Sequence, residues 1–361
     1  MSIYSIYVAL NQSCIEILEN TVNKNELLAL LQPDIEQINE TMRNEISQCG
    51  NAQLQQILEY ALFNGGKRIR PILTVLSARL CAFSRMPEGL AEEDELKPPV
   101  NLYRLASVFE FLHGASLLHD DVIDNAGKRR GKPSANRVWD NTQVILAGDF
   151  LHARALTMAG TVGDSHTLSL IGTATAAMIQ AEFLQMQAVQ ERNLSEKNYF
   201  SVLRGKTGCL ISVACEVGAY FAQSGDEHQK ALRGYGDALG LAFQIVDDLL
   251  DYQGDPHKTG KAVGNDFVEG KMTLPLIHAL QNCDRQEFDH IMDLLKGNAS
   301  VRAEQISEVR GFIEQYDGFT YAGQGAETLI EAAHEALAVF PDCQSRKILA
   351  GLANYVLTRQ K

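Results

Sequence analysis

The distribution of proline constrains the fold of this chain more than any other feature of its sequence. The nine prolines lie at 33, 71, 87, 98, 99, 133, 256, 275 and 341, and none falls between Pro133 and Pro256. A proline inside a helix costs about 3 kcal/mol, so a long stretch without proline favours helices. The stretch is rich in Ala, Leu and Gln and shows helical periodicity, whereas alternating strand patterns are nearly absent. We therefore predict an all-α fold built from many long helices.

Three stretches interrupt this pattern and are expected to be irregular: 84–101, 255–271 and 317–325. The first holds three prolines and an acidic run, which is typical of a surface loop. None of these stretches needs to mark a domain boundary. We interpret residues 1–45 as an additional helical extension and residues 46–361 as one large domain.

Charge and cysteine content exclude several classes of protein. The chain has 361 residues, with 32 Lys and Arg against 45 Asp and Glu, a net charge of −13. Nucleic acid and anionic lipid both need a positive surface, so we expect neither as a partner. The seven cysteines are odd in number and form no CxxC pair, which argues against a disulfide framework and favours a reducing compartment. Without a basic N-terminal region or an apolar run of 18 residues, we predict a cytoplasmic protein with no transmembrane segment.

A first cluster of carboxylates ends the apolar helical run at 109–118. Asp120 and Asp124 share one helix face roughly 6 Å apart, and Asp121 lies on the flank. At that separation each pair repels by about 3 kcal/mol at an effective dielectric of 20, and by under about 1 kcal/mol in water. A hard cation such as Mg²⁺ would reverse this repulsion. Alone, the cluster is explained as well by a solvated acidic helix end.

The same spacing recurs 127 residues later, at Asp247, Asp248 and Asp251, again after an apolar helical run. Two such helices facing each other would line one cavity with six carboxylates. A fold does not bury that much negative charge without cations. The pair of motifs therefore favours a metal–phosphate site.

Basic residues are also clustered despite the acidic total. Lys67, Arg68 and Arg70 follow Gly65 and Gly66, and a run at 128–132 begins four residues after Asp124. Arginine matches phosphate oxygens with two hydrogen bonds, and glycine lets backbone approach an anion. Solvated surface residues are the alternative, which we accept for Lys132 and Arg68. The acidic and basic clusters together describe a site for two diphosphates, one bound through metal and one bound directly.

Five segments of the chain, in order, resemble the trans-isoprenyl diphosphate synthases of the polyprenyl synthetase family. They are GGKRIRP, LLHDDVIDNAGKRRGKPSAN, KTGCL, FQIVDDLLDYQGD and GKAVGNDFVEGKMTLP. The resemblance covers roughly residues 45–361, and the combination of motifs is specific although each piece alone is not. It implies that 46–361 is a catalytic domain, a helical bundle around a central cavity of the isoprenoid synthase type.

The resemblance also implies a reaction. An allylic diphosphate is ionised with help from three Mg²⁺ ions. The double bond of isopentenyl diphosphate then attacks the allylic cation. A proton is then lost and the cycle repeats, giving an all-trans polyprenyl diphosphate. Metal ions and cationic side chains would stabilise the departing diphosphate, and an apolar pocket would keep water from the cation. The resemblance further suggests a homodimer.

Residue by residue, the resemblance assigns roles to three sets of side chains. The metal ligands correspond to Asp120, Asp121, Asp124, Asp247, Asp248 and Asp251. The isopentenyl diphosphate pocket corresponds to Lys67, Arg70, His113 and Arg130. The groups around the allylic diphosphate correspond to Arg129, Lys206, Thr207, Gln244, Lys261 and Lys271. Gln185 stands where short-chain members often carry aspartate and is given a polar role. Without the resemblance, His113 would be interpreted as a packing residue.

The residues that precede Asp120 partly predict the length of the product. Ala115 and Ser116 lie one helical turn earlier and should face the same cavity. Both are small, whereas short-chain members often place aromatic residues there as a floor. We therefore predict a product of C30 or longer, octaprenyl-like, which suits a quinone side chain. A farnesyl or geranylgeranyl diphosphate synthase is the alternative.

Other functions remain open at this point. Glu110 with His113, and Glu331 with His334, form two ExxH pairs like those of di-iron helical bundles. This pattern arises easily by chance and leaves both aspartate motifs unexplained. A terpene cyclase on the same fold typically replaces the second motif by an Asn/Ser/Glu triad, and a non-catalytic subunit usually loses one or both motifs. This chain keeps both.

Overall fold

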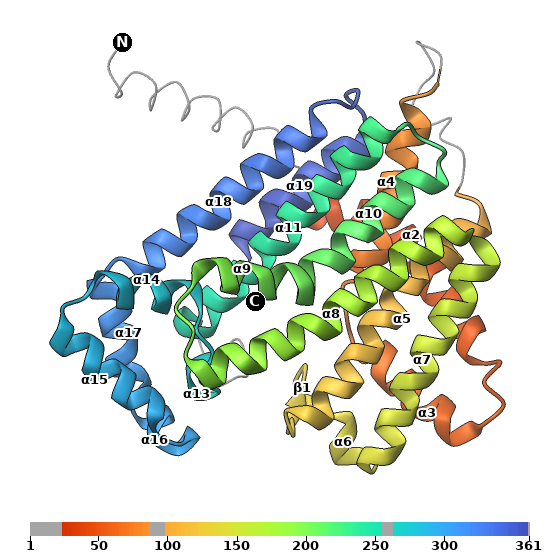
Figure 1. The fold of residues 1–361 in the computed structure, drawn as a ribbon. Coiled ribbons are helices and arrows are strands. Elements are labelled where there is room, and N and C mark those ends of the chain that lie inside the picture. Colours follow the sequence, from red (N-terminus) through yellow and green to blue (C-terminus); the bar gives the residue numbers. More distant parts are fainter. Residues whose placement is uncertain (1–23, 87–97, 255–262, 360–361) are drawn as a thin grey trace, which may run out of the picture.

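The protein is almost entirely helical in a computed structural model that describes residues 24–86, 98–254 and 263–359 (Figure 1). Lys261, and parts of the stretches 84–101 and 255–271 that were expected to be irregular, lie outside the described residues. The longer helices are α2 (Lys24–Ile46), α3 (Ala52–Phe63), α4 (Ile69–Phe83), α5 (Val100–Ile123), α7 (Asn141–Val162), α8 (Ser165–Glu191), α10 (Cys209–Phe221), α11 (Asp226–Gln253), α15 (Arg285–Lys296), α18 (Gly318–Leu337) and α19 (Gln344–Thr358). The shorter ones are α6 (Ala135–Val138), α9 (Glu196–Leu203), α13 (Asn265–Val268), α14 (Leu274–Asn282), α16 (Ala299–Glu304), α17 (Ile306–Gln315) and the π-helical turn η2 (Arg204–Gly208). The predicted all-α class is confirmed.

The two strands of the described chain form one short antiparallel hairpin after α5. Strand β1 (Lys128–Arg129) pairs with β2 (Lys132–Pro133), and Arg129 lies opposite Lys132. Arg130 and Gly131 make the turn with φ values of 52° and 78°, as tight two-residue hairpins require. The basic run at 128–132 is therefore folded back on itself.

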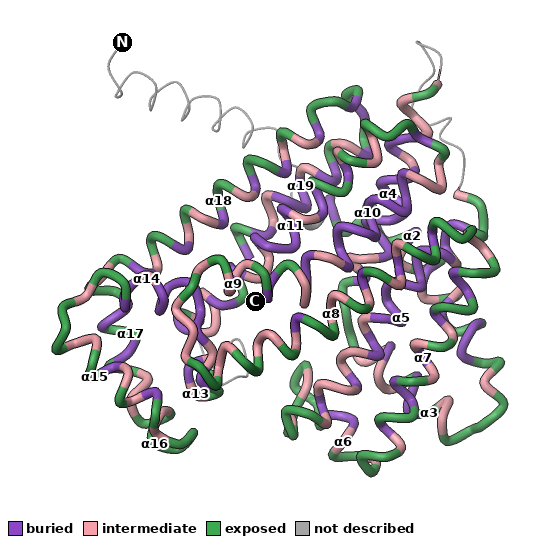
Figure 2. The backbone as a smooth tube through the Cα atoms, in the orientation of Figure 1, coloured by how far each residue is buried: buried purple, intermediate pink, exposed green. Residues whose placement is uncertain are grey.

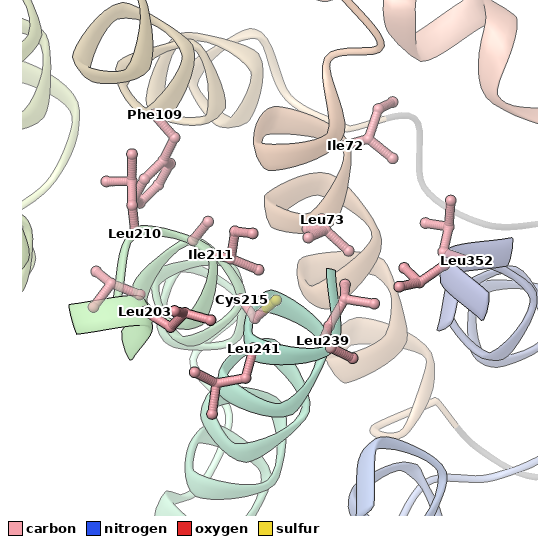
Figure 3. Packing of buried hydrophobic residues seen from close by; sticks show 14 of the residues in the cluster. Ile72, Leu73, Phe109, Leu203, Leu210, Ile211, Cys215, Leu239, Leu241 and Leu352 are labelled. Carbon is pink, nitrogen blue, oxygen red and sulfur yellow. The ribbon is translucent and has the colours of Figure 1, made fainter. Parts of the chain in front are cut away.

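The centre of the molecule is formed by α4, α5, α10 and α11, whose side chains interdigitate in Figure 3. Helices α4 and α10 bury residues on nearly every face, which is the behaviour of helices that are apolar all round. The central helices approach closely where side chains are small. A Cβ at Gly236 of α11 would lie 2.7 Å from Ser212 Cα of α10. This close packing holds the middle of α11, the helix that carries the second aspartate motif near its end, against α10.

One hydrophobic core extends through the described chain, from α2 to α19. Ile38, Met42 and Ile46 of α2 are buried in it. The predicted boundary near residue 45 lies in the last turn of α2, so the described part of the extension packs with the rest of the bundle. None of the cysteines in the described ranges forms a disulfide.

The expectation of an irregular stretch at 317–325 was wrong. Helix α18 begins at Gly318, directly after Asp317, which has a positive φ of 55°. A side chain at Gly318 would collide with the Pro275 carbonyl oxygen of α14, so this glycine allows close packing. The glycines of this segment therefore do not break the helix.

Helix α8 is 27 residues long and is the one described helix with the length and apolar character that a membrane span needs. It packs against α7, α10 and η2. Its other face is exposed or half-buried along much of its length (Figure 2).

Candidate active site

The first aspartate motif (Asp120, Asp121 and Asp124) occupies the C-terminal end of α5. Asp121 is 2% exposed, and its Oδ1 accepts a hydrogen bond from Arg129 Nε at 2.7 Å. Its Oδ2 lies 3.4 Å from the backbone nitrogen of Ala135. Asp121 thus fixes the hairpin and α6 against the helix end, while Asp120 and Asp124 remain accessible.

The second aspartate motif (Asp247, Asp248 and Asp251) occupies the last two turns of α11. Asp248 is buried, where it accepts hydrogen bonds from Tyr199 Oη at 2.7 Å and Gln244 Nε2 at 3.1 Å. Asp251 accepts one from the backbone nitrogen of Asp266 at 2.9 Å. The second aspartate of each motif is therefore an internal brace, because a residue one position along a helix turns about 100° away.

Asp247 pairs with Arg359, near the end of the described chain. The Arg359 Nη2 atom lies 3.1 Å from Asp247 Oδ1, and the guanidinium covers the ring of Phe243. The arginine side chain is only 4% exposed, whereas that of Asp247 is 52% exposed. Arg359 was not predicted, and no local pattern connects two residues so far apart in sequence.

A lysine on the π-helical turn η2 faces the first motif. Lys206 Nζ lies 2.8 Å from Glu182 and 3.3 Å from Gln185, both on α8. Its charge acts on Asp120. Gln185, for which a polar role was predicted, bonds to Lys206, and Glu182 is a further partner of this lysine that sequence reasoning missed. The spacing of Glu182 and Gln185, three residues apart on one helix, is the signal that could have found it.

The π-helical turn packs closely against α8 and α11 where Gly205 and Gly240 have no side chain. A Cβ at Gly205 would lie 2.5 Å from the Cβ of Ala181 on α8, and one at Gly240 of α11 would lie 2.8 Å from Gly208 Cα. Short π segments inside helices are frequent at functional sites. Here the turn directs Lys206 and Thr207 toward the pocket, where Thr207 Oγ1 bonds to Gln244 Oε1 at 3.2 Å.

One pocket lies beside the second motif, and a lysine on its wall lies close to both motifs. The pocket lies between α8, α9, η2 and α11 and is lined by Gln185, Tyr199, Lys206, Asp248, Asp266 and Lys271. Lys271 pairs with Asp266 at 3.1 Å and Glu269 at 2.6 Å. Its charge acts on Asp124 of the first motif and on Asp251 of the second. The two motifs therefore border the same space.

The carboxylates of this space are short of compensating positive charge. Burial raises the pKa of Asp120 to about 6, against the opposing charge of Lys206. Burial and the neighbouring Asp266 raise the pKa of Asp251 to about 7. Burial would lower the pKa of Lys271, but Asp266 and Glu269 outweigh it and raise that pKa. A set of oxygen donors that lacks a counter-charge fits a hard divalent cation such as Mg²⁺.

A second, basic cluster lies around Gly65 and Gly66 at the start of α4. Arg130 donates a hydrogen bond to the Gly65 carbonyl oxygen, and a Cβ at Gly66 would lie 3.0 Å from an Arg130 Nη. Burial, followed by the charges of Arg70 and Arg130, holds the pKa of His113 well below its usual value. The Nε of Arg70 is buried with no hydrogen-bond partner. A buried guanidinium with an unsatisfied donor fits an anion.

The other residues named in the sequence analysis differ in their partners and in how far they are buried. Lys67 Nζ bonds to Tyr355 Oη at 3.1 Å. The expectation that Arg68 is a solvated surface residue was wrong: it is buried, with Nη1 2.9 Å from Glu110. Lys132 bonds to Asn64. Ala115 is fully buried.

The di-iron alternative gains no support from the described residues. Glu110 is engaged by Arg68, and His334 Nε2 lies 2.7 Å from Asn354 Oδ1. Neither ExxH pair belongs to a group of three metal-capable ligand atoms. The lysine and arginine contacts around the aspartate motifs point instead to an anion.

Comparisons with known proteins agree with this chemistry. The model of the family "Polyprenyl synthetase" matches residues 51–313. The chain is 33% identical over 335 residues to octaprenyl diphosphate synthase of Haemophilus influenzae, covering 93% of this chain and 97% of that one. It is also 31% identical over 340 residues to a short chain isoprenyl diphosphate synthase of Methanothermobacter thermautotrophicus, covering 93% and 99%.

Two solved structures show the same fold. A decaprenyl diphosphate synthase from Rhodobacter capsulatus has a TM-score of 0.82 at 34% identity, with 93% of this chain and 99% of that one covered. A polyprenyl synthase from Caulobacter crescentus, complexed with calcium and isoprenyl diphosphate, has a TM-score of 0.81 at 32% identity, covering 93% and 97%.

Proposed function

The chain belongs to the polyprenyl synthetase family, and from this premise we propose that it is a trans-prenyltransferase that extends an allylic diphosphate with isopentenyl diphosphate units. One observation supports this most strongly: the two aspartate motifs border a single space that also contains Lys206 and Lys271. The departure of diphosphate requires carboxylates that hold metal and lysines that hold phosphate.

The allylic diphosphate is assigned to the side of the cavity that carries both motifs. Asp120, Asp124, Asp247 and Asp251 would hold the Mg²⁺ on which the family depends, and we propose three ions in the closed complex. When bound, Mg²⁺ stabilises the negative charge that develops on oxygen as the bond to the allylic carbon breaks. Lys206 and Thr207 donate to the same diphosphate, and Arg129, Gln244, Lys261 and Lys271 are assigned to its surroundings.

Isopentenyl diphosphate is assigned to the basic cluster at the start of α4. Arg70 and Arg130 supply charge, and Lys67 and His113 complete the set. Burial and the surrounding arginines lower the pKa of His113, so its ring is neutral. It therefore adds hydrogen bonding to the site without further positive charge. The unsatisfied Nε of Arg70 supports this assignment.

We propose a long-chain product, C30 or longer, because Ala115 and Ser116, one helical turn before Asp120, are both small. The relatives include both octaprenyl and short-chain synthases, so the chain's own residues decide this point. Incubating the protein with labelled isopentenyl diphosphate, Mg²⁺ and C10, C15 or C20 starters should give products of C30 or longer. Ala115→Phe should shorten them. Products that end at C15 or C20 in the native chain would contradict the long-chain assignment, and absence of incorporation would contradict the prenyltransferase itself.

We assign the protein to the cytoplasm as a homodimer. The homodimer would explain why apolar side chains are exposed on α8. Ile179, Phe183 and Met186 form one stripe and are 55%, 68% and 47% exposed. We propose that a second copy covers this stripe. Phe183→Glu should shift the protein to monomer in sedimentation, whereas Gln324→Glu, at an exposed position of α18, should not. A native chain that sediments as a monomer would contradict the dimer.

A further inference from the structure

A second group of metal-capable side chains lies on α5 and α7, outside the space bordered by the two aspartate motifs. His119 is on α5, and Asp149 and His152 are three residues apart on α7, which places them on one helix face. One ligand atom from each residue lies within 4.8 Å of the other two. Among the described residues this is the only group of three with that property.

The arrangement of His119 is fixed by α7. Its Nε2 lies 3.4 Å from Asp149 Oδ1 and 3.2 Å from the Ile145 carbonyl oxygen. Residue 148 is a glycine, and a Cβ there would overlap the imidazole, so the ring lies directly on the helix backbone. The rings of His119 and His152 are 5.6 Å apart between centroids.

The donor set of two imidazoles and one carboxylate differs in kind from the all-oxygen set of the aspartate motifs. Zn²⁺ accepts nitrogen and oxygen donors and binds catalytic-type sites through three protein ligands, whereas Mg²⁺ prefers oxygen alone. Tetrahedral Zn²⁺ holds donors about 3.3 Å apart, so the donors need to move by about 1 Å.

The side chain of Asp149 has the freedom for this movement, because it is 61% exposed and can rotate.

We propose that His119, Asp149 and His152 bind one zinc-class divalent ion, with a fourth coordination position open to water. The ion joins α5 to α7 one residue before Asp120. This site depends on the fold alone and not on the proposed reaction. When Nε2 of His119 takes the metal, the ring proton resides on Nδ1, and Nε2 no longer donates to the Ile145 carbonyl oxygen.

The test is a zinc titration of the full chain, stripped of metal, against a chromogenic chelator and in excess Mg²⁺, which occupies sites built from oxygen alone. We expect one saturable equivalent of Zn²⁺. His152→Leu and Asp149→Asn should each weaken its affinity about tenfold or more. Because Asp149 is exposed, its variant keeps the test valid if His152→Leu fails to fold.

The matched control is His290→Leu. His290 Nε2 lies 2.6 Å from Glu308, so it is a histidine–carboxylate pair without a third ligand among the described residues. Its loss should leave zinc affinity unchanged. Cu²⁺ bound in place of Zn²⁺ should show coupling to two nitrogens in electron paramagnetic resonance, and His152→Leu should remove one. Equal zinc affinity in the native chain and both variants, or no saturable binding, would overturn the proposal.

Discussion

Single residues of the two aspartate motifs divide into those that face the cavity and those that brace it. Asp121 and Asp248 are buried against Arg129 and Tyr199, while Asp120 and Asp251 border the shared space. The spacing of the motifs predicts this cavity but not the division. The partners of the bracing residues come from other elements, so no pattern around the motifs announces them.

Lys206 is expected to contribute directly to turnover. Its Nζ lies 2.8 Å from Glu182 and 3.3 Å from Gln185, and its charge acts on Asp120. Removing one donor to a departing anion costs about 10²–10³-fold in kcat. Lys206→Gln should show a loss of this size in steady-state assays. The control is Arg204→Gln, two residues earlier, because Arg204 is 56% exposed and pairs with Asp237; equal losses in both variants would refute a specific role for Lys206.

At the scale of elements, the sequence predicts helices well and their irregularities poorly. The proline-free stretch does contain α7, α8, α9, α10 and α11. The π-helical turn between α9 and α10 was not predicted, since Gly205 and Gly208 act through contacts with α8 and α11 that only the folded chain makes. The same holds for Gly318, which was interpreted as part of a loop and instead packs α18 on α14.

A substitution in the π-helical turn tests whether the turn positions Lys206. Gly205→Ala would place a Cβ 2.5 Å from Ala181 Cβ, which cannot rotate away. We expect about 1–3 kcal/mol loss of stability in urea unfolding and a further loss of activity, because Lys206 is displaced. Gly172→Ala, on α8 with nothing within 4 Å of the new Cβ, should instead stabilise by about 0.5–1 kcal/mol. Full activity in folded Gly205→Ala would show that the turn does not position Lys206.

For the molecule as a whole, metal and pH should be coupled through stability. Asp120 and Asp251 have pKa values of about 6 and about 7, above the usual value of about 4 in an unfolded chain. Between about pH 4 and pH 7 these two carboxyl groups bind more protons in the folded state than in the unfolded state. The free energy of unfolding therefore falls as pH rises through this range. Urea unfolding of the metal-free protein should therefore show lower stability at pH 7.5 than at pH 5.

Two comparisons separate this effect from the general acidity of the chain. Asp251→Asn should reduce the difference between pH 5 and pH 7.5, because the substituted amide does not titrate. Mg²⁺ with inorganic diphosphate should reduce it in the native protein by supplying the missing positive charge. A pH dependence of the same size in Asp251→Asn and in the native chain would show that this carboxylate is not a source of the effect.

A double-mutant cycle tests whether α5 and α11 present their aspartates to one metal–diphosphate complex. The cycle measures isopentenyl diphosphate incorporation for Asp124→Asn, Asp251→Asn and the double variant. Each single change should lower kcat by about 10²-fold or more, since several kcal/mol of charge stabilisation depends on the metal. Groups that act as a unit are not additive, so the double variant should be at most about tenfold slower than the slower single variant. Losses that simply multiply, or a single variant with native kcat, would contradict a shared site.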